Sequence, residues 1–342
     1  MRIFENPIGT TAAGRRGATG LSGLVIVCIA TACGGDRIVS SESAGLTDST
    51  ALSAPVGGGP ESPDSAGGLI AATAQAPGIV YGTYGMDASL LNSVHTGTLR
   101  GGGMDQNNVI SILSAVRSKG GRIVLKLCNG KDSYVKNSDG TFSFTKWKAL
   151  VDRFKQTNFG PYLSDGTIIG HFLIDEPQRA AKWGGKSIPA STVEAMAKYS
   201  KQLWPGMTTF VRAGPTWLAT SSIGYTYLDA GWAQYAASKG NVGSWIAAEV
   251  AAAKRKGLGL AVGLNVLDGG NGSSGIRGIS GGSAMSANEI KSYGTALLDQ
   301  SYACAFYNWM YDSGYYGRTD IKSAMAAMST KAQSHQRTAC RQ

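Results

Sequence analysis

Two adjacent acidic residues, Asp175 and Glu176, follow a strongly apolar segment of this 342-residue chain. The segment at 170–174 and the proline at 177 are typical of a strand that ends at a polar site. Side chains alternate along a strand, so we expect one acid to point into a site at the strand end and the other toward a neighbouring strand or loop. Burial and a second negative charge both raise a carboxyl pKa, so this pair could supply a protonated general acid. The alternative is a turn in which Asp175 caps a helix and Glu176 is a surface residue.

Cationic and aromatic residues are also expected near strand ends. Lys126 and Arg212 each end an apolar run, where they could hold a hydroxyl or carboxylate group of a substrate, or pair with Asp175. Aromatic faces stack on the C–H surfaces of sugars, although packing in the core is the alternative for each aromatic residue alone. The residues expected to bind substrate are Tyr81, Lys126, Arg212, Trp217, Asp229, Trp232, Asn265, Trp309 and Asp312.

Short apolar runs alternate with helical patterns from residue 77 onward. The expected strands are 79–85, 122–128, 167–174, 208–212, 227–230, 258–266 and 303–309. Several are apolar throughout, as parallel strands covered on both faces are. Helices are expected between them, and Ser191-x-x-Glu194 and Ser286-x-x-Glu289 have the spacing of capping boxes that open two of these helices.

Repeated strand–helix units predict a parallel sheet, either open or closed. An open dinucleotide-binding sheet would need a Gly-x-Gly-x-x-Gly turn after its first strand, and that turn is lacking here. We therefore predict an α/β fold with one globular domain, a (β/α)8 TIM-like barrel. Its eighth strand is expected within 90–99. The chemistry of such barrels lies at the carboxyl ends of the strands.

The sequence Ile174-Asp175-Glu176-Pro177 resembles the Asn-Glu-Pro signature that ends strand four of the retaining (β/α)8 glycoside hydrolases. With the eighth strand placed before 122, the two acids end strand four, and 258–266 becomes strand seven. The resemblance implies that Glu176 is the acid/base and that Trp309 forms the floor of a sugar site. The family's nucleophile is a Glu that ends strand seven, whereas this sequence has Asn265 and Asp268 in that region.

Two mechanisms follow from this resemblance. In the first, Glu176 is the acid and Asp268 the nucleophile or base. A carboxyl separation of ~5–5.5 Å then implies retention of configuration, and ~6.5–9.5 Å implies inversion. In the second, similar to hydrolases of N-acetylated sugars, Asp175 orients the acetamido group and Glu176 protonates the leaving oxygen.

We therefore expect a glycoside hydrolase that cleaves a polysaccharide or oligosaccharide by carboxylate catalysis. The alternative is a non-catalytic glycan-binding protein, because strand seven lacks the family's Glu. A third hypothesis is a lyase for acidic sugars that uses Lys126 as its essential lysine.

Composition indicates which classes of partner the protein could bind. A net charge of +10 favours anionic partners such as nucleic acid, an anionic polysaccharide or a phospholipid surface, and the alternative is a solvated basic surface with no such partner. The longest basic run has three residues, at 254–256, and we expect no nucleic-acid binding. With three histidines and no Cys-x-x-Cys pair, we expect no metal and no cofactor. We also expect a monomer, a Cys304–Cys340 disulfide and a core position for His171.

The first part of the chain has the pattern of an export signal. Arg15 and Arg16 precede an apolar run at 21–32 that is short for a membrane span. Ala30-Thr31-Ala32-Cys33 resembles the bacterial lipoprotein signal, which implies lipidation of Cys33. The alternatives are cleavage after Ala32 without lipidation and an uncleaved anchor.

These patterns divide the chain into three parts. Residues 1–32 are the expected signal peptide, and 33–76, which are rich in Ser, Gly, Ala and Pro, are the expected flexible linker. Residues 77–342 are the expected barrel domain. We expect an exported protein, either anchored in the bacterial cell envelope through the lipid at Cys33 or secreted.

Overall fold

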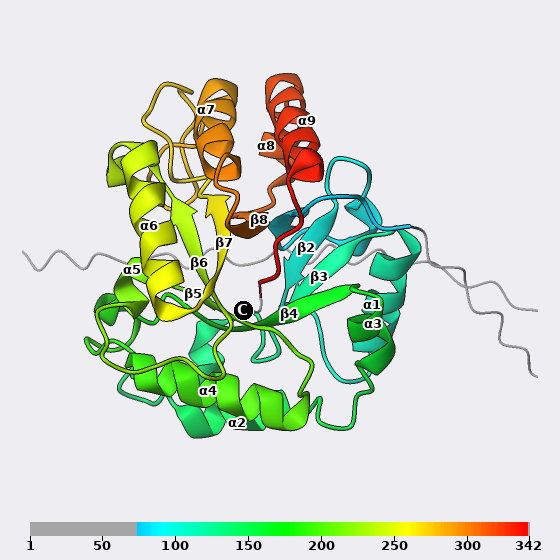
Figure 1. Ribbon diagram of the computed structural model, residues 1–342, viewed down its shortest axis with the longest axis vertical. Helices are drawn as coiled ribbons and strands as arrows, with labels where there is room; N and C mark the ends of the chain where they lie inside the picture. The colour runs from blue at the N-terminus through cyan, green and yellow to red at the C-terminus, as the bar shows by residue number, and fades with distance from the viewer. Residues whose placement is uncertain (1–73, 341–342) are drawn as a thin grey trace, which may run out of the picture. The chain divides into compact units, whose positions relative to one another are not determined.

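Eight parallel strands close into a barrel in the computed structural model, which describes residues 74–340 (Figure 1). Each strand pairs with the next in the chain, and the last pairs with the first. The strands are β1 (Val80–Tyr84), β2 (Gly97–Arg100), β3 (Arg122–Leu125), β4 (Ile168–Asp175), β5 (Thr209–Arg212), β6 (Ala230–Tyr235), β7 (Gly259–Leu264) and β8 (Ala303–Asn308). The predicted (β/α)8 barrel is confirmed. The predicted signal peptide, Cys33 and almost all of the predicted linker lie outside the described residues.

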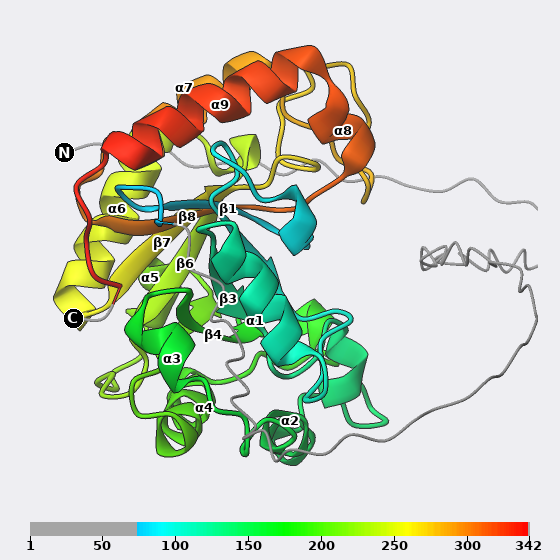
Figure 2. The same ribbon diagram turned by 90° about the vertical axis from the view of Figure 1, so that its right-hand side faces the viewer.

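Helices surround this barrel because each buries one apolar face against the strands. In α9, for example, Ile321, Ala324, Met325 and Met328 are buried. Figure 2 shows α9 along one side of the barrel, beside α7. The helices are α1 (Val109–Ser118), α2 (Phe144–Asp152), α3 (Gly160–Ser164), α4 (Ala190–Leu203), α5 (Pro215–Leu218), α6 (Val242–Lys256), α7 (Ala287–Leu298), α8 (Ser313–Gly317) and α9 (Thr319–Ser334). Single 3₁₀ turns lie at η1 (Ala88–Leu90), η2 (Asp132–Val135), η3 (Ala180–Lys182) and η4 (Ala237–Lys239).

Three local predictions need correction. The strand expected at 227–230 was misplaced, because β6 begins at Ala230 and continues through a mixed sequence to Tyr235. The strand that was expected within residues 90–99 is β2, the second strand in chain order. It lies at the end of that range and extends one residue beyond it. The capping box predicted at Ser191 was wrong, because α4 begins at Ala190 after Pro189. Ser286 and Glu289 do form the predicted capping box.

Large side chains fill the inside of the barrel, and glycines opposite them provide the space. A Cβ atom at Gly263 would collide with the backbone oxygen of Tyr307, and one at Gly82 would collide with the Tyr307 ring. A Cβ at Gly170 would collide with Phe210 in the same way. The inside of the barrel is therefore a packed core, as in other barrels of this kind.

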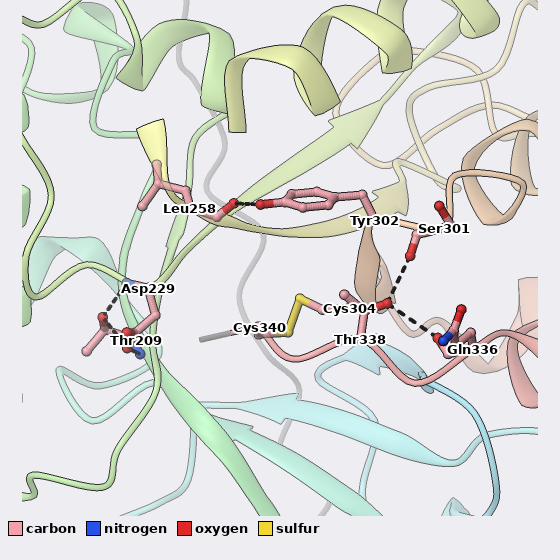
Figure 3. The surroundings of a disulfide bond; sticks show 9 residues. All are labelled: Thr209, Asp229, Leu258, Ser301, Tyr302, Cys304, Gln336, Thr338 and Cys340. Atoms are coloured by element: carbon pink, nitrogen blue, oxygen red, sulfur yellow. Dashed lines mark hydrogen bonds between the residues drawn. A yellow bond between two sulfur atoms is a disulfide. The ribbon is translucent and has the colours of Figure 1, made fainter. Parts of the chain in front are cut away.

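The carboxy-terminal segment is linked to the barrel by a disulfide between Cys304 of β8 and Cys340, as predicted (Figure 3). Cys304 lies at the start of β8, so the bond is at the amino end of the barrel. Thr338 supports this segment by donating a hydrogen bond of 2.9 Å to the backbone oxygen of Ser301. Within residues 74–340, none of the helices is both long and apolar enough to cross a membrane.

Candidate active site

A register shift near the end of β4 decides where Asp175 points. Phe172 packs inside the barrel, whereas Leu173 and Ile174 both pack in the core between strands and helices. The pairing of β4 with β5 shifts between Phe172 and Asp175, as at a β-bulge. The Asp175 side chain therefore returns to the inside of the barrel, where its Oδ1 accepts a 2.8 Å hydrogen bond from Arg212.

Glu176 has an unusual backbone conformation for a residue with a side chain, with φ of 49°. Non-glycine residues in this region are uncommon and are concentrated at functional sites. Two contacts hold it: its N–H donates to the Arg212 carbonyl at 3.1 Å, and its carbonyl accepts from the Trp183 indole at 2.9 Å. Its carboxylate lies 3.2 Å from Arg212 Nη1 and 3.1 Å from Arg179 Nη1. Asp175 therefore points into the barrel and Glu176 toward the neighbouring strand and the following loop, and both acids contact Arg212.

Six charged side chains form one network at the carboxyl end of the barrel. We call this group the mouth cluster, and it consists of Lys126, Asp132, Asp175, Glu176, Lys182 and Arg212. Lys182 pairs with Asp175 and, at 2.8 Å, with Asp132. Asp132 also accepts from Lys126 at 3.1 Å, so positive and negative groups alternate through the network. The sequence analysis missed Asp132 and Lys182, because both lie in 3₁₀ turns rather than at strand ends.

This network keeps Asp175 ionised. Burial alone would raise the pKa of Asp175, but the positive charges of Arg212, Lys182 and Lys126 outweigh burial and hold this pKa well below its usual range. The prediction that burial keeps the carboxyl protonated is therefore wrong for Asp175. The Asp175 carboxylate instead orients the Arg212 and Lys182 side chains through its ion pairs with them.

Lys126 is an almost fully buried member of the mouth cluster. Burial alone would lower the pKa of its ammonium group, but its ionisable neighbours, Cys128 and Tyr84 before Asp132 and Asp175, raise this pKa above the ordinary value. A Schiff-base lysine must lose its proton, so this environment opposes the lyase hypothesis. The sequence left two roles open for Lys126, contact with a substrate or an ion pair with Asp175. The structure contains an ion pair, but its partner is Asp132, at 3.1 Å.

A pocket of about 330 Å³ opens beside the mouth cluster, at the ends of β4 to β7. Glu176 and Arg212 line it, as do three tryptophans whose rings could pack against a sugar. We call it the mouth pocket. Its lining is Glu176, Gln178, Arg212, Ala213, Gly214, Thr216, Trp217, Trp232, Ala233, Gln234, Ala236, Lys239, Trp245, Glu249 and Asn265. Five of the predicted site residues are therefore brought together here: Glu176, Arg212, Trp217, Trp232 and Asn265.

Three nitrogen atoms of residues that line the mouth pocket are buried and have no hydrogen-bond partner among the described residues. They are Arg212 Nε, Trp232 Nε1 and Gln234 Nε2. Each carries N–H groups and accepts nothing. A buried donor without a hydrogen-bond partner costs about 1–3 kcal/mol.

Glu249 of α6 is a second carboxylate that lines this pocket, and the sequence analysis missed it. It accepts hydrogen bonds of 2.9 Å from both the backbone N–H and the hydroxyl of Thr216. Gly214 allows this approach, because a Cβ atom there would lie 2.5 Å from Glu249 Oε1. A carboxylate in mid-helix gives no strand-end signal, so only the tertiary packing of α6 against α5 reveals it.

Trp309 follows β8, as expected from the resemblance, but it does not line the mouth pocket. Its ring packs against Tyr84 with 4.3 Å between centroids. The Arg212 guanidinium lies 5.2 Å from the Trp309 centroid and 5.7 Å from that of Trp232. Trp309 therefore packs against the Arg212 side chain outside the lining of the mouth pocket.

Besides Trp309, four predicted site residues belong neither to the mouth cluster nor to the lining of the mouth pocket. Tyr81 is fully buried, and its hydroxyl contacts Met325 of α9. Asp312 caps α8 by accepting from the Tyr315 N–H. Asp268 lies in the loop after β7, where its Oδ1 accepts from the Ser280 N–H.

Asp229 lies at the amino end of β6, opposite the expected end, because this strand begins one residue later. It pairs with Lys201 at 2.6 Å and accepts from the Thr209 N–H at 2.8 Å. Figure 3 shows Asp229 and Thr209 in the surroundings of the disulfide. The residue joins β5, β6 and α4, far from any role at the mouth pocket.

His171 has the core position that was predicted. It is fully buried, its Nδ1 lies 2.9 Å from the Ser200 hydroxyl, and burial lowers its pKa to about 3. Across residues 74–340, no group of three or more His, Cys, Asp or Glu side chains is arranged to hold a metal ion.

Comparisons with known proteins rest on structure. Neither the protein-family models nor the curated proteins contain a match to this sequence. A β-glucanase from Saccharophagus degradans aligns over 77% of this chain and 95% of its own, with 11% identity and a TM-score of 0.50. An endoglucanase catalytic domain from Xanthomonas campestris aligns over 76% and 94%, with 10% identity and a TM-score of 0.46. A β-D-glucuronidase of Dictyoglomus thermophilum aligns over 69% of this chain and only 44% of its own, with 8% identity and a TM-score of 0.45. The alignment with the β-glucanase supports the barrel fold alone.

Proposed function

We propose that this protein is a glycoside hydrolase that acts on a polysaccharide or oligosaccharide in the mouth pocket. The observation that carries the proposal is the placement of Glu176. A carboxylate at the end of β4 lines a pocket that also contains Trp217, Trp232 and Trp245. Catalytic groups in this fold lie at the carboxyl ends of the strands, where Glu176 is.

Glu176 is the proposed acid, and Glu249 replaces Asp268 as the proposed second carboxylate. Glu176 gives its proton to the glycosidic oxygen as the bond from that oxygen to C1 breaks. Water adds its hydroxyl to C1, and its proton passes to Glu249. Asp175 takes no proton in this scheme. It fixes Arg212, which in turn contacts Glu176.

The test is hydrolysis of a panel of polysaccharides by the full chain and by three matched variants. Glu176→Gln and Glu249→Gln should each lower the rate at least 100-fold, because general acid–base catalysis contributes about 10²–10⁴-fold. Asp268→Asn, which removes a carboxylate outside the pocket, should change the rate by less than about threefold. Glu176→Gln should leave the free energy of unfolding within about 1 kcal/mol of the parent. Unchanged turnover in Glu176→Gln would refute the proposal.

A second function, glycan binding without turnover, is favoured by one observation. The mouth pocket has Asn265 in the strand-seven region, and the Glu176 carboxylate is paired with Arg212 and Arg179. In a binding protein, Glu176→Gln would leave the affinity for an oligosaccharide within about threefold, and the parent would release no reducing sugar. Reducing-sugar release by the parent decides between the two functions.

We also propose that the protein is exported and lipid-anchored through Cys33. The basic residues Arg15 and Arg16, the apolar run at 21–32 and the small residues before Cys33 support this. The disulfide between Cys304 and Cys340 is consistent with an oxidising compartment. Labelling of the full chain with a fatty-acid analogue in a bacterial host should be lost in Cys33→Ser. Equal labelling of that variant would exclude Cys33 as the site.

A further inference from the structure

Exposed basic side chains without acidic partners gather at the amino end of the barrel. Each outer helix runs back from the carboxyl end, so its last turn lies at the end where the next strand begins. Lys254 and Arg255 belong to the last turn of α6, and Lys119 directly follows α1. Arg337 lies between α9 and the disulfide, whose surroundings Figure 3 shows. We call these four residues the amino-end cluster. All are exposed, and none lies within ion-pair distance of a carboxylate of residues 74–340.

The acidic side chains at this end do not offset that charge. Three of them are already neutralised by ion pairs, which are Asp165 with Arg117, Asp229 with Lys201 and Asp299 with Lys331. Asp152, at the end of α2, accepts from the Tyr199 hydroxyl. The amino-end cluster therefore gives this end an excess of positive charge.

Helix dipoles account for only part of this excess. A cation is favoured in the last turn of a helix, and Lys256 of α6 already donates to the backbone oxygens of Ser221 and Ile223. Arg337 belongs to no helix, so no helix end explains its position. The cluster therefore carries more charge than the helix ends require.

A pocket of about 260 Å³ at the same end has the same character. Arg122 and Arg337 line it, and no acidic residue in the described part of the chain does. Arg122 Nε, Nη1 and Nη2 each donate to a neutral oxygen. Burial, and after it the nearby charge of Arg337, lower the pKa of Arg122 to about 10. An anionic group near these two arginines would offset their mutual repulsion.

The positions of the cluster fit a flat anionic surface rather than one strand of a polyanion. Lys119 lies before β3 and Arg255 before β7, and these two strands are opposite each other in the eight-stranded barrel. A single-stranded polyanion is bound in a groove that follows its backbone. Charges spread around one end of a protein can instead contact a bilayer together.

The chain ahead of the described residues also joins the barrel at this end. Arg122 donates to the backbone oxygens of Ala76 and Gly78, which holds the start of the described chain there. An anchor at Cys33 would therefore act on the positively charged end of the barrel.

We propose that the amino end of the barrel is a membrane-contacting surface, on which the amino-end cluster binds the headgroups of anionic phospholipids. In that orientation the mouth pocket faces away from the bilayer, because it lies at the opposite end. The inference extends the proposed export and anchoring, and it does not depend on any reaction at the mouth pocket.

The test measures binding of the full chain to vesicles. Cys33→Ser is present throughout, so no protein is lipidated at that position, and the residues before 74 are the same in every variant compared. Vesicles of phosphatidylcholine alone are compared with vesicles that contain about one-third phosphatidylglycerol, at about 0.1 M salt. The chain should bind the anionic vesicles at least 10-fold more tightly, and about 0.5 M salt should remove most of that preference. Equal affinities for the two kinds of vesicle would overturn the proposal.

Two sets of charge reversals locate the contact. The amino-end variant is Lys119→Glu/Lys254→Glu/Arg255→Glu/Arg337→Glu. The matched control reverses exposed cations that follow β3, β4, β7 and β8, and it is Lys131→Glu/Lys186→Glu/Arg277→Glu/Lys322→Glu. Both sets change the net charge by the same amount. The amino-end variant should bind anionic vesicles at least 10-fold more weakly, and the control less than threefold more weakly. Equal losses would show that net charge alone drives binding and would refute the surface.

Neutral replacements provide a second variant if the charge reversals prevent folding. With glutamine at the four positions of the amino-end cluster, affinity for anionic vesicles should fall at least threefold while the near-ultraviolet circular dichroism stays that of the parent. Unchanged affinity in this folded variant would contradict the proposal.

Other anionic partners and the proposed anchor are tested separately. Binding of polygalacturonate or RNA without binding of anionic vesicles would overturn the proposal. Fatty-acid labelling that persists in Cys33→Ser would refute the anchor and leave the surface intact. Equal vesicle binding by the amino-end variant and its parent would refute the surface and leave the anchor intact.

Discussion

Arg122 and Arg212 are both largely buried, at opposite ends of the same barrel, and their partners differ in kind. At the amino end, Arg122 donates to the backbone oxygens of Ala76 and Gly78 and to the side chain of Gln75. Burial, together with the nearby charge of Arg337, lowers the pKa of Arg122 to about 10. At the carboxyl end, burial would likewise lower the pKa of Arg212, but Asp175 and Glu176 raise it.

The two arginines therefore have different surroundings. Neutral partners of Arg122 fix the chain leading into β1. Carboxylate partners of Arg212 lie beside the mouth pocket. The contrast concerns these two arginines alone, because the amino end also contains the buried ion pair of Lys201 with Asp229.

The largest expected effect on stability is that of removing the disulfide between Cys304 and Cys340 at the amino end of the barrel. The disulfide joins residues separated by 36 positions, and a loop of that length corresponds to about 4 kcal/mol in the chain-entropy model. The double variant Cys304→Ala/Cys340→Ala should therefore lose about 4 kcal/mol of unfolding free energy in urea titrations. Its affinity for an oligosaccharide at the other end should stay within about twofold. A large loss of affinity would show that the two ends are coupled.

The next effect concerns the carboxyl end. Arg212→Met should lower the free energy of unfolding by about 3 kcal/mol, because it leaves buried Asp175 without its arginine. Ligand binding at the mouth pocket should fall with it. A loss below about 1 kcal/mol would mean that Lys182 alone compensates Asp175, and the contrast between the two ends would weaken.

Arg122→Met is the matched substitution at the amino end and should be milder, at about 1–2 kcal/mol. Its partners are neutral oxygens, which can turn to water more readily than a buried carboxylate can. Chemical denaturation of both variants in one buffer gives the comparison directly. If Arg122→Met proves the more destabilising, charge pairing is not what distinguishes the ends.

The smallest expected effect is on the response to acid. The folded-state pKa of Asp175 is below its usual value of about 3.9. Its stabilising contribution is therefore present above about pH 4 and is lost as the pH falls toward the folded-state value. In Arg212→Met this pKa should rise toward the unfolded-state value, so the loss of stability on acidification should be smaller than in the parent. Unfolding free energies measured from pH 6 to pH 2.5 would show the smaller loss, and an unchanged profile would contradict it.

Six of the eight strands could be found from the sequence because a strand covered on both faces is apolar along its length, whereas β2, whose sequence is Gly-Thr-Leu-Arg, could be placed only within a range of ten residues. β6 was misplaced because its own sequence, Ala-Gly-Trp-Ala-Gln-Tyr, mixes small and polar residues with aromatic ones. Those residues are what the site requires: Trp232 and Gln234 face the mouth pocket. The strand that contributes most to the pocket was therefore the hardest to recognise.

Site residues could be predicted where a charged side chain lies at the end of a strand, as Glu176 and Arg212 do. Asp175 could not be oriented, because the register shift in β4 changes which face its side chain occupies, and alternation alone cannot predict such a shift. Glu249 and Asp132 belong to a helix and a turn, so only packing shows that they reach the mouth. Ionisation of Asp175 depended on Lys182, which also approaches from a turn.

The contacts of Arg122 with Ala76 and Gly78 determine at which end of the barrel another molecule can be attached ahead of residue 74. They hold the start of the described chain at the amino end of the barrel, where Cys340 is also bound. A fusion partner, a surface coupling or a tether joined ahead of residue 74 would attach on that side. That attachment point is at the end of the barrel opposite the mouth pocket, so a bulky partner could be joined there without contact to the residues that line the pocket.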